Sequence, residues 1–590
     1  GSYYDNYTPA VSVQQIEKEL TELKKAGFNA VKYCLVVPPD YIMDIYDRMG
    51  MYMYIEYPIW NPTETDAFFE RSYLQMMELV KAGRNHPCLI LSDFNCEDLE
   101  FTPEMDALMS WCVGEAKTVA PNRLYTDNSS NGAHKYGDFT TCHPYYQVNC
   151  YEDMLEGWIA ERGAGKPMIL GEFADISVLR DLAALNAQST EKYTWYHEYF
   201  GDYDDAKIMR DAGYTEEQVQ AVIQASVDNA QELRKFYLEA SKANSTVAGL
   251  FLTHIFESPN GWADGWFDDL YKPHFDAAFI RRSAAEEALL LDRETLNYWA
   301  GGTAALGASV SFYGGRDLTG GKLTYALKDS GKTVKSGTIS ADVSLKGGGY
   351  YGLGDFQVTF PESAQAIRYE LELTLEGGGK KLVNSWNLWA YPAAGLSEGS
   401  SVQVYDPGRT LELRERYPWM SAYTGTGDKP EVIVTTQLTG SILNHLTNGG
   451  KVVYLGVGDG PVKVTENWDY NRMSFAFLPD AGNSLAASLK NGGYGGLQFL
   501  ELATRYHMEV PDGGTNLVGR WATTQGSIGS YIQERASGQG LLIQSTLRHN
   551  SAPFTLGGGL LTHESLSAGG YENVLGEYLI DQMVLYALQK

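Results

Sequence analysis

Several features are scarce in this sequence of 590 residues, and each scarcity removes a class of protein. No apolar run reaches the ~18–20 residues that a membrane-spanning helix needs. Basic residues are too few to build the positive face that nucleic acids and anionic membranes require, because 46 Lys and Arg stand against 74 Asp and Glu, a net charge of −28. We therefore expect neither nucleic acid nor a membrane as a partner.

Cysteine is also scarce, and its six positions are confined to the start of the chain, at residues 34, 88, 96, 112, 142 and 150. No CxxC pair and no Cys/His ligand spacing occurs, which disfavours a zinc site. Buried free thiols are favoured over disulfides. The single Gly-rich turn "GVGDG" lacks the rest of a phosphate-binding pattern, so a nucleotide site is not expected. The sequence therefore predicts no metal and no organic cofactor.

The composition that remains is typical of a large globular protein. Hydrophobic residues make up 44% of the chain and charged residues 20%, and the length favours roughly three or four domains. Forty Tyr and twelve Trp are many, and flat amphipathic rings suit the faces of sugars, although most must simply pack. The opening "GSYYDNY" shows no signal peptide, and its first two residues, "GS", look like a cloning scar or an internal cut, so we expect the natural N-terminus upstream.

The first part of the chain, residues 1–292, alternates strands with amphipathic helices. Seven apolar strands are predicted, beginning at residues 28, 51, 88, 123, 138, 167 and 247. Such alternation predicts a parallel sheet covered by helices, here a (β/α)8 barrel that lacks its first strand. We expect an N-terminal fragment, a segment left out of the chain or a second copy to supply it. The rival is that "YYDNYTPAVSV" forms the strand, although Asp5, Asn6 and Pro9 disfavour it.

The pattern of apolar and polar residues changes twice in the rest of the chain. Residues 293–392 alternate apolar and polar residues between Gly-rich turns, which predicts an antiparallel, immunoglobulin-like β-sandwich. Residues 393–590 return to strand–helix alternation and predict a smaller, flavodoxin-like α/β domain.

Two glutamates stand where a barrel carries its active site. Glu97 follows the strand "CLIL", and Glu172 ends the strand "KPMILGEF". Residues just past the C-terminal end of a barrel strand face the mouth of the barrel. Two carboxylates across that mouth are the minimal set for cleaving a glycoside, one as acid and one as nucleophile or base. The alternative is that each glutamate caps a helix or pairs with a Lys or Arg.

The segments "ELTELKKAGFNAVK", "RNHPCLILSDFNCE" and "KPMILGEF" resemble the catalytic barrel of glycoside hydrolase family 2, which contains β-galactosidases, β-glucuronidases and β-mannosidases. The resemblance covers the first half of the chain. It implies that Glu97 is the general acid/base and Glu172 the nucleophile. The family has Asn directly before the acid/base, whereas this chain has Cys96, with Asn95 one place earlier. Either the strand end bulges so that Asn95 takes that role, or the sugar 2-position is read differently.

Further residues are expected around the mouth. Trp60 follows the strand that begins at residue 51, and His143 and Tyr145 follow the strand that begins at residue 138; the aromatic residues either bind a sugar or pack under a loop. Glu257 and Trp262 follow the last strand and are expected to wall the pocket. Asp93 and Asp98, which flank Glu97, are expected in surface or capping roles.

The segment 174–246 is longer than one connecting helix requires. Its acidic, aromatic stretch "STEKYTWYHEYFGDYDD" is expected to narrow the pocket as a specificity cap. The C-terminal domain resembles amidotransferase-like accessory domains of sugar hydrolases, but no Cys follows residue 150, so it has no amidotransferase nucleophile.

The predicted function is a retaining, exo-acting β-glycosidase that hydrolyses terminal β-linked sugars, β-galactosides first, with an oligosaccharide or glycoside as its partner. The alternative is a weak or inactive family member that acts as a carbohydrate-binding or scaffold protein.

Overall fold

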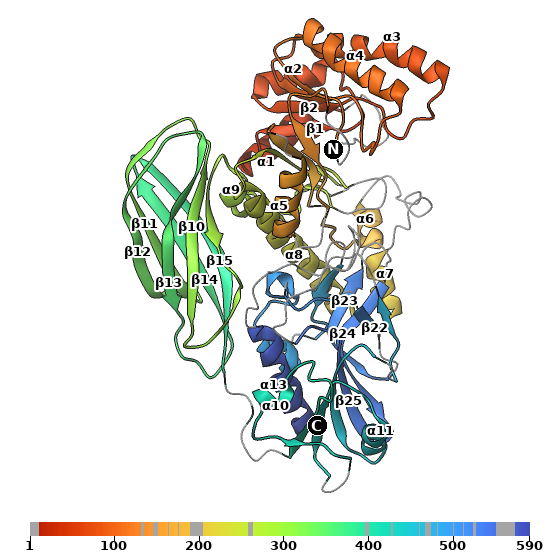
Figure 1. The fold of residues 1–590 in the computed structure, drawn as a ribbon, viewed down its shortest axis with the longest axis vertical. Coiled ribbons are helices and arrows are strands. Elements are labelled where there is room, and N and C mark those ends of the chain that lie inside the picture. Colours follow the sequence, from red (N-terminus) through yellow and green to blue (C-terminus); the bar gives the residue numbers. More distant parts are fainter. Residues whose placement is uncertain are drawn as a thin grey trace.

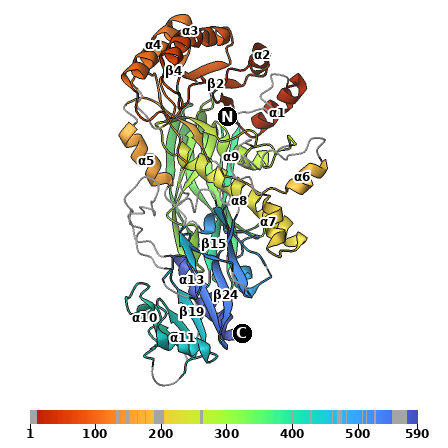
Figure 2. The same cartoon turned by 90° about the vertical axis from the view of Figure 1, so that its right-hand side faces the viewer.

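The computed structural model describes residues 11–590 apart from several short stretches. The residues outside the description are 1–10, 131–134, 146–150, 163–164, 175, 189–203, 258–263, 269, 394–395, 397–400, 426–428, 459–460, 467–473, 481, 500, 505, 511–512, 523–526 and 550–572. Figure 1 shows an N-terminal α/β part at the top, a β-rich part beside it and a second α/β part at the bottom. Figure 2, turned by 90°, shows the two α/β parts again at opposite ends.

The N-terminal part contains seven strands that pair in parallel. They are β1 Ala30–Tyr33, β2 Tyr52–Glu56, β3 Leu89–Asp93, β4 Leu124–Thr126, β5 Thr140–Cys142, β6 Met168–Phe173 and β7 Val247–Leu252. Each begins within two residues of its predicted start. Four form a sheet in the order β1-β2-β3-β4, and three form a second sheet in the order β5-β6-β7. Parallel α/β sheets are thus confirmed.

A closed barrel is not confirmed. Within the described residues, neither β1 nor β7 has a strand paired along its outer edge, and β4 is not paired with β5. A cavity of about 1010 Å³ lies beside the two outer edges and is lined by residues 27–30 on one side and 246–250 on the other. The expectation that an upstream strand fills this place stays a prediction, and residues 1–10, which hold the rival candidate, lie outside the description.

Helices connect these strands and cover the sheets. They are α1 Val13–Lys25, α2 Asp40–Met49, α3 Asp66–Gly83, α4 Pro103–Val119, α5 Tyr151–Arg162, α6 Leu182–Gln188, α7 Asp205–Asp211, α8 Glu216–Lys242 and α9 Ala277–Ala284. Four of them begin where a Ser or Thr side chain accepts the N–H of the residue three places on, namely at Ser12, Thr65, Thr102 and Thr215. Such caps satisfy amide groups that a helix start leaves without partners.

Part of the long segment between β6 and β7 packs into the hydrophobic cores of the protein. Helix α8 packs Leu233, Phe236 and Tyr237 into the core of the N-terminal part. Helix α7 and the start of α8 pack instead against strand β21 Ser474–Phe477 of the C-terminal part, where Met209 and Val222 share a cluster with Phe477. The stretch expected to cap the pocket lies outside the described residues up to residue 203, so that role stays a prediction.

The β-rich middle region is a pair of sheets. Its strands are β8 Glu287–Asp292, β9 Asn297–Trp299, β10 Thr303–Phe312, β11 Leu318–Asp329, β12 Lys332–Leu345, β13 Gly349–Thr359, β14 Ile367–Gly377 and β15 Lys380–Tyr391. The sheet orders are β13-β10-β8 and β12-β11-β14-β15-β9. In β14, Tyr369, Leu371, Leu373 and Leu375 are buried at alternate positions, as a strand with one face on the core requires.

The C-terminal part holds one mixed sheet with a few helices. Its strands are β16 Val402–Tyr405, β17 Ser421–Ala422, β18 Val432–Thr435, β19 Lys451–Leu455, β20 Val464–Glu466, β21 Ser474–Phe477, β22 Tyr506–Glu509, β23 Thr515–Ala522, β24 Ser527–Ser537 and β25 Gly540–Ser545. Its helices are α10 Leu413–Arg416, α11 Gly440–Thr447, α12 Ser484–Ser488, the 3-10 helix Gly496–Phe499 and α13 Val574–Gln589. Strands β16, β18, β19 and β25 pair in parallel and are followed by antiparallel neighbours.

The predicted domain boundaries at residues 292/293 and 392/393 stay predictions; β8 already pairs with β10 before the first of them. Among the described residues no helix combines the length and the apolar character that crossing a membrane would take.

Candidate active site

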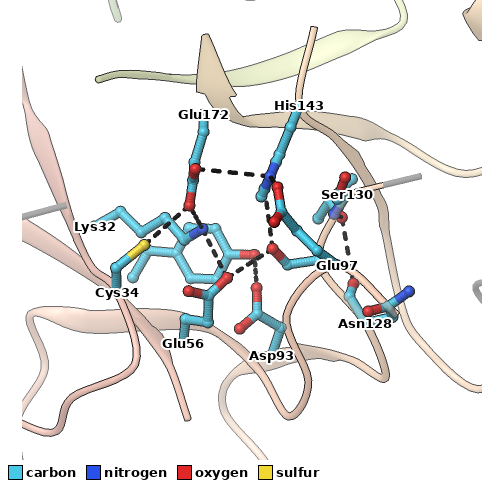
Figure 3. Close-up of polar contacts among 12 residues, drawn as sticks. Lys32, Cys34, Glu56, Asp93, Glu97, Asn128, Ser130, His143 and Glu172 are labelled. Carbon is cyan, nitrogen blue, oxygen red and sulfur yellow. Dashed lines mark hydrogen bonds and ion pairs between the residues drawn. The ribbon is translucent and has the colours of Figure 1, made fainter. Parts of the chain in front are cut away.

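The carboxyl ends of β3 and β6 bring Glu97 and Glu172 together (Figure 3). One carboxylate oxygen of each lies within 4.8 Å of the other. Glu172 is the second-last residue of β6, whereas Glu97 follows β3 by four residues. There the backbone N–H of Glu97 donates to the carbonyl of Ser129 at 3.0 Å, and Glu97 adopts a left-handed φ of 58°. For a non-glycine residue such a backbone is uncommon and marks a position fixed by its surroundings.

Glu172 is held as an anion by three donors. Lys32 Nζ donates to Oε1 at 3.1 Å, and the Cys34 thiol donates to the same oxygen at 2.9 Å. The Tyr145 hydroxyl donates to Oε2. Burial by itself raises the pKa of Glu172, but the charges of His143 and Lys32 outweigh it and hold the pKa well below its usual value. The carboxylate is therefore ionised.

Glu97 has a different neighbour and a more open position. Its Oε1 lies 2.8 Å from His143 Nδ1, and its side chain is 37% exposed against 15% for Glu172. The same Nδ1 lies 3.7 Å from Glu172 Oε2, so the imidazole stands between the two acids. The two carboxyl groups thus differ in environment, which is how a pair divides into an acid and a nucleophile.

Beneath the two acids lies a buried ion pair. Lys32 Nζ donates to Glu56 Oε1 at 2.8 Å, and the two side chains are 1% and 0% exposed. Burial lowers the pKa of Lys32, but the neighbouring Cys34, Glu56 and Glu172 more than offset this and raise it well above its ordinary value. Lys32 therefore carries a fixed positive charge at the floor of the site.

Asp93, at the end of β3, completes the floor. It is fully buried and accepts a hydrogen bond from the Tyr54 hydroxyl. Burial, and after it the charge of Glu56, raises the pKa of Asp93 well above its usual value, which favours the neutral form of the side chain. The expectation of a surface or capping role for Asp93 was wrong. Because β3 is covered on both sides, an aspartate at its end has no route to solvent.

The other predicted residues have varied positions. His143 and Tyr145 are at the site, as described above. Trp60 is 53% exposed and pairs in a parallel bridge with Cys96, which in turn bridges to Ser129. The indole therefore lies open to solvent beside the strand end that carries Glu97.

Asn95 is fully buried, and its amide donates to Asp98 at 3.2 Å, within the turn after β3. The described contacts of Asn95 thus hold the turn. Glu257 is also buried and pairs with Arg180 at 2.8 Å and His274 at 2.5 Å. Its carboxylate thus joins two other segments of the chain, and the expectation that Glu257 walls the pocket stays a prediction. Trp262 lies outside the described residues.

Sequence reasoning gave no site role to Lys32, Cys34, Glu56 or Ser129. A signal was present, because Lys32 and Glu56 are charged residues inside apolar strands, "AVKY" and "YMYIE". Buried charges in proteins are nearly always paired, so each should have suggested a partner.

Some side chains at and near the site could in principle bind a metal ion. In the described part of the chain, three groups bring ligand atoms within 4.8 Å of one another: Cys34, Glu56 and Glu172; Asp44, Asp47 and His86; and Glu97, His143 and Glu172. In the first, the Lys32 ammonium already donates to both carboxylates. The expectation that the site uses no metal stays a prediction.

Comparisons with known proteins give distant likenesses. Residues 303–392 match the family model "Domain of unknown function (DUF8488)". Among curated proteins none matches the chain. Similar solved structures include a β-D-mannosidase from Dictyoglomus thermophilum, with 14% identity, 65% of this chain and 48% of that chain covered, and a TM-score of 0.48. An FMN-binding β-glucuronidase from Facaelibacterium prausnitzii L2-6 has 14% identity, with 64% and 53% covered and a TM-score of 0.36.

A β-glucuronidase from Bacteroides uniformis has 13% identity, with 68% and 46% covered and a TM-score of 0.37. The chain spans about half of the length of these structures. At such identities and TM-scores, an activity has to be inferred from the site itself.

Proposed function

We propose that this protein is a retaining, exo-acting β-glycosidase in which Glu172 is the nucleophile and Glu97 the general acid/base. The observation that carries the proposal is the approach of their carboxylate oxygens to within 4.8 Å. Retaining enzymes hold their two carboxyl groups about 5–5.5 Å apart, whereas inverting enzymes leave about 6.5–9.5 Å for a water molecule. The short separation favours direct attack by a carboxylate over attack by an activated water.

The chemistry would be a double displacement. In the first step a Glu172 oxygen bonds to the anomeric carbon, the glycosidic C–O bond breaks, and Glu97 gives its proton to the departing oxygen. In the second step water attacks the same carbon, the bond to Glu172 breaks, and Glu97 takes a proton from the water. The ionised state of Glu172, held by Lys32 and Tyr145, suits the attack.

The substrate class proposed is a terminal β-linked sugar, with β-galactosides the first to test. The exposed Trp60 next to the strand end of Glu97 offers a flat face on which a sugar ring can stack. Carbohydrate is accordingly the partner proposed for this site.

A carbohydrate-binding protein without turnover is the second candidate. It is favoured by the buried Asn95, whose amide is engaged with Asp98, and by Cys96 where the resembling family carries Asn. Loss of an amide bond to the sugar 2-hydroxyl would remove stabilisation that grows in the transition state.

A panel of aryl β-glycosides separates the two candidates. The proposal predicts phenol release from at least one of them by the unaltered protein, and loss of that release in Glu172→Gln. Glu70→Gln, an exposed glutamate on α3, is the matched control and should retain full activity. Binding of sugars in calorimetry without phenol release from any glycoside would favour the binding protein. Equal activity of Glu172→Gln and the unaltered protein would refute the assigned nucleophile.

A further inference from the structure

Hydrogen bonds connect the two proposed catalytic acids through the floor of the site. His143 Nε2 lies 3.0 Å from Ser129 Oγ, and the Ser129 hydroxyl donates to Glu56 Oε1 at 2.6 Å. Glu56 Oε1 also accepts from Lys32 Nζ at 2.8 Å, and Lys32 donates to the nucleophile. These four side chains come from β1, β2 and the segments that follow β4 and β5, and all four are buried.

The number of protons in this chain of contacts fixes the tautomer of His143. A serine hydroxyl has one proton to donate, and an ionised carboxylate only accepts. Burial raises the pKa of Glu56, but Lys32 outweighs it and keeps the pKa below its usual value, so the carboxylate is ionised. The Ser129 proton therefore points to Glu56, 2.6 Å away, and the Ser129 oxygen accepts from His143. His143 Nε2 must then carry a hydrogen.

A consequence follows at the other nitrogen of the ring. With a hydrogen on Nε2, a neutral imidazole presents only a lone pair at Nδ1. That lone pair faces Glu97 Oε1 at 2.8 Å, a separation at which two acceptors repel unless a proton lies between them. One proton is thus shared by Glu97 and His143, as Glu97–H with neutral imidazole or as carboxylate with imidazolium.

We propose that His143 is a positioning residue that keeps the proton of the general acid on the Glu97–His143 pair, with Ser129 and Glu56 fixing its ring as the Nε2–H tautomer. This inference rests on the acid role proposed for Glu97. The shared proton goes to the leaving-group oxygen as the glycosidic bond breaks, which leaves Glu97 as carboxylate and His143 neutral. In the second step the pair takes one proton from the attacking water, and the starting state is restored.

The charged groups around His143 agree with this assignment. Carboxylates face the ring from the end of β3 in Glu97, from β6 in Glu172 at 3.7 Å, and from β2 in Glu56 through Ser129. Among the described residues the cation of this group is Lys32 of β1, which donates to Glu56 and Glu172. The two carboxylates outside the pair, Glu172 and Glu56, favour the retention of a proton on it.

The backbone leaves space for the ring at one glycine. A Cβ at Gly171, directly before the nucleophile, would lie 3.1 Å from His143 Nε2 and 3.3 Å from its Cδ2. Both distances are tighter than ordinary van der Waals contact, so the imidazole would have to shift by a few tenths of an ångström to accept a Cβ at this position. Gly171→Ala should therefore displace the ring without removing any group of the chain of contacts.

The direct test uses the ring nitrogens and needs no substrate. Protein labelled with ¹³C and ¹⁵N in histidine alone is studied by NMR, and the signal lost in His143→Gln identifies the ring. We expect Nε2 to stay protonated between about pH 5 and pH 9, across the range in which histidines usually titrate. Ser129→Ala should mix the two tautomers. A neutral His143 protonated on Nδ1, or a tautomer unaffected by Ser129→Ala, would overturn the proposal.

Kinetic measurements then test whether His143 acts through the general acid, Glu97. His143→Gln should lower kcat/KM for alkyl β-glycosides, which need a proton, by roughly 10²-fold or more, and spare dinitrophenyl glycosides, which do not. Equal losses on both substrates would indicate a structural role and refute the proposal. If no glycoside is hydrolysed by the unaltered protein, the proposed glycosidase fails, while the NMR result still decides the shared proton.

Discussion

Removal of the Lys32 ammonium should lower the free energy of unfolding by an amount that the structure allows us to estimate. Lys32→Met keeps most of the side-chain volume but leaves Glu56 and Glu172 without their common cation. The ion pair is 1% and 0% exposed, with a 2.8 Å contact, so solvent screens almost none of it. Removing one partner of a buried pair typically costs about 3–5 kcal/mol, because the other charge stays buried and uncompensated. We expect a loss of this size.

Urea unfolding at neutral pH, followed by tryptophan fluorescence, measures the free energy of unfolding. Lys81→Met is the matched control, because its ion pair with Glu78 is exposed, at 43% and 70%, and solvent screens it, so its loss should hardly change the free energy of unfolding. The double variant Lys32→Met/Glu56→Gln should recover part of the loss, since the buried charge is then gone. A loss below about 1 kcal/mol in Lys32→Met would refute the reasoning. So would a double variant no more stable than the single one.

The same network predicts a dependence on pH. The pKa of Glu172 is depressed by folding, so its contribution to stability is present above about pH 4.3 and is lost as the pH falls through the folded value. The pKa of Lys32 is raised, so its contribution is present below about pH 10.4 and is lost as the pH rises through the folded value. The stability deficit of Lys32→Met should thus be largest near neutral pH and shrink in acid, where the carboxylates protonate.

Three further outcomes are expected. Burial raises the pKa of the Glu501 carboxyl to about 7, so its contribution to stability is present below about pH 4.3 and is lost as the pH rises through 7. Glu501→Gln should therefore increase the free energy of unfolding at pH 8 by up to about 3 kcal/mol, measured as a higher Tm, and should leave the Tm unchanged at pH 4. Glu97→Ala should slow the hydrolysis of glycosides with poor leaving groups by about 10²–10⁴-fold and spare that of activated glycosides, whereas Glu172→Ala should abolish both unless azide or formate replaces the carboxylate. Steady-state rates measured across a series of leaving groups test this, and equal losses on every substrate would contradict the assigned roles. Gly171→Ala should lower kcat/KM for alkyl glycosides as His143→Gln does, and full activity would show that the ring does not need the space.

The strands were predictable because their signal is local. Runs such as "VVYL" and "MILGEF" are apolar on both faces, which only a parallel strand covered on two sides can use. The change to alternating polarity after residue 292 likewise predicted the β-rich region. The positions of Glu97, Glu172, His143 and Tyr145 at strand ends followed from the same rule, since such ends share one edge of the sheet.

The contacts beneath the acids were not predictable in the same way. Lys32 meets Glu56 across 24 positions and Glu172 across 140, and nothing local in the sequence links these residues. Asp93 was misread because the composition of a strand end does not reveal whether the end is covered. The ion pair of Glu257 with Arg180, 77 positions away, could not be predicted either, because it depends on the tertiary fold.

Covalent trapping of the nucleophile tests the proposed function most directly. The protein is incubated with a series of 2-deoxy-2-fluoro β-glycosyl fluorides, digested and analysed by mass spectrometry. Because a 2-fluoro substituent slows the second step of a double displacement, the account predicts a sugar attached to the peptide that contains Glu172 for at least one member of the series. Glu172→Gln should give no adduct. An adduct on another residue, or none with any sugar that the protein hydrolyses, would contradict the account.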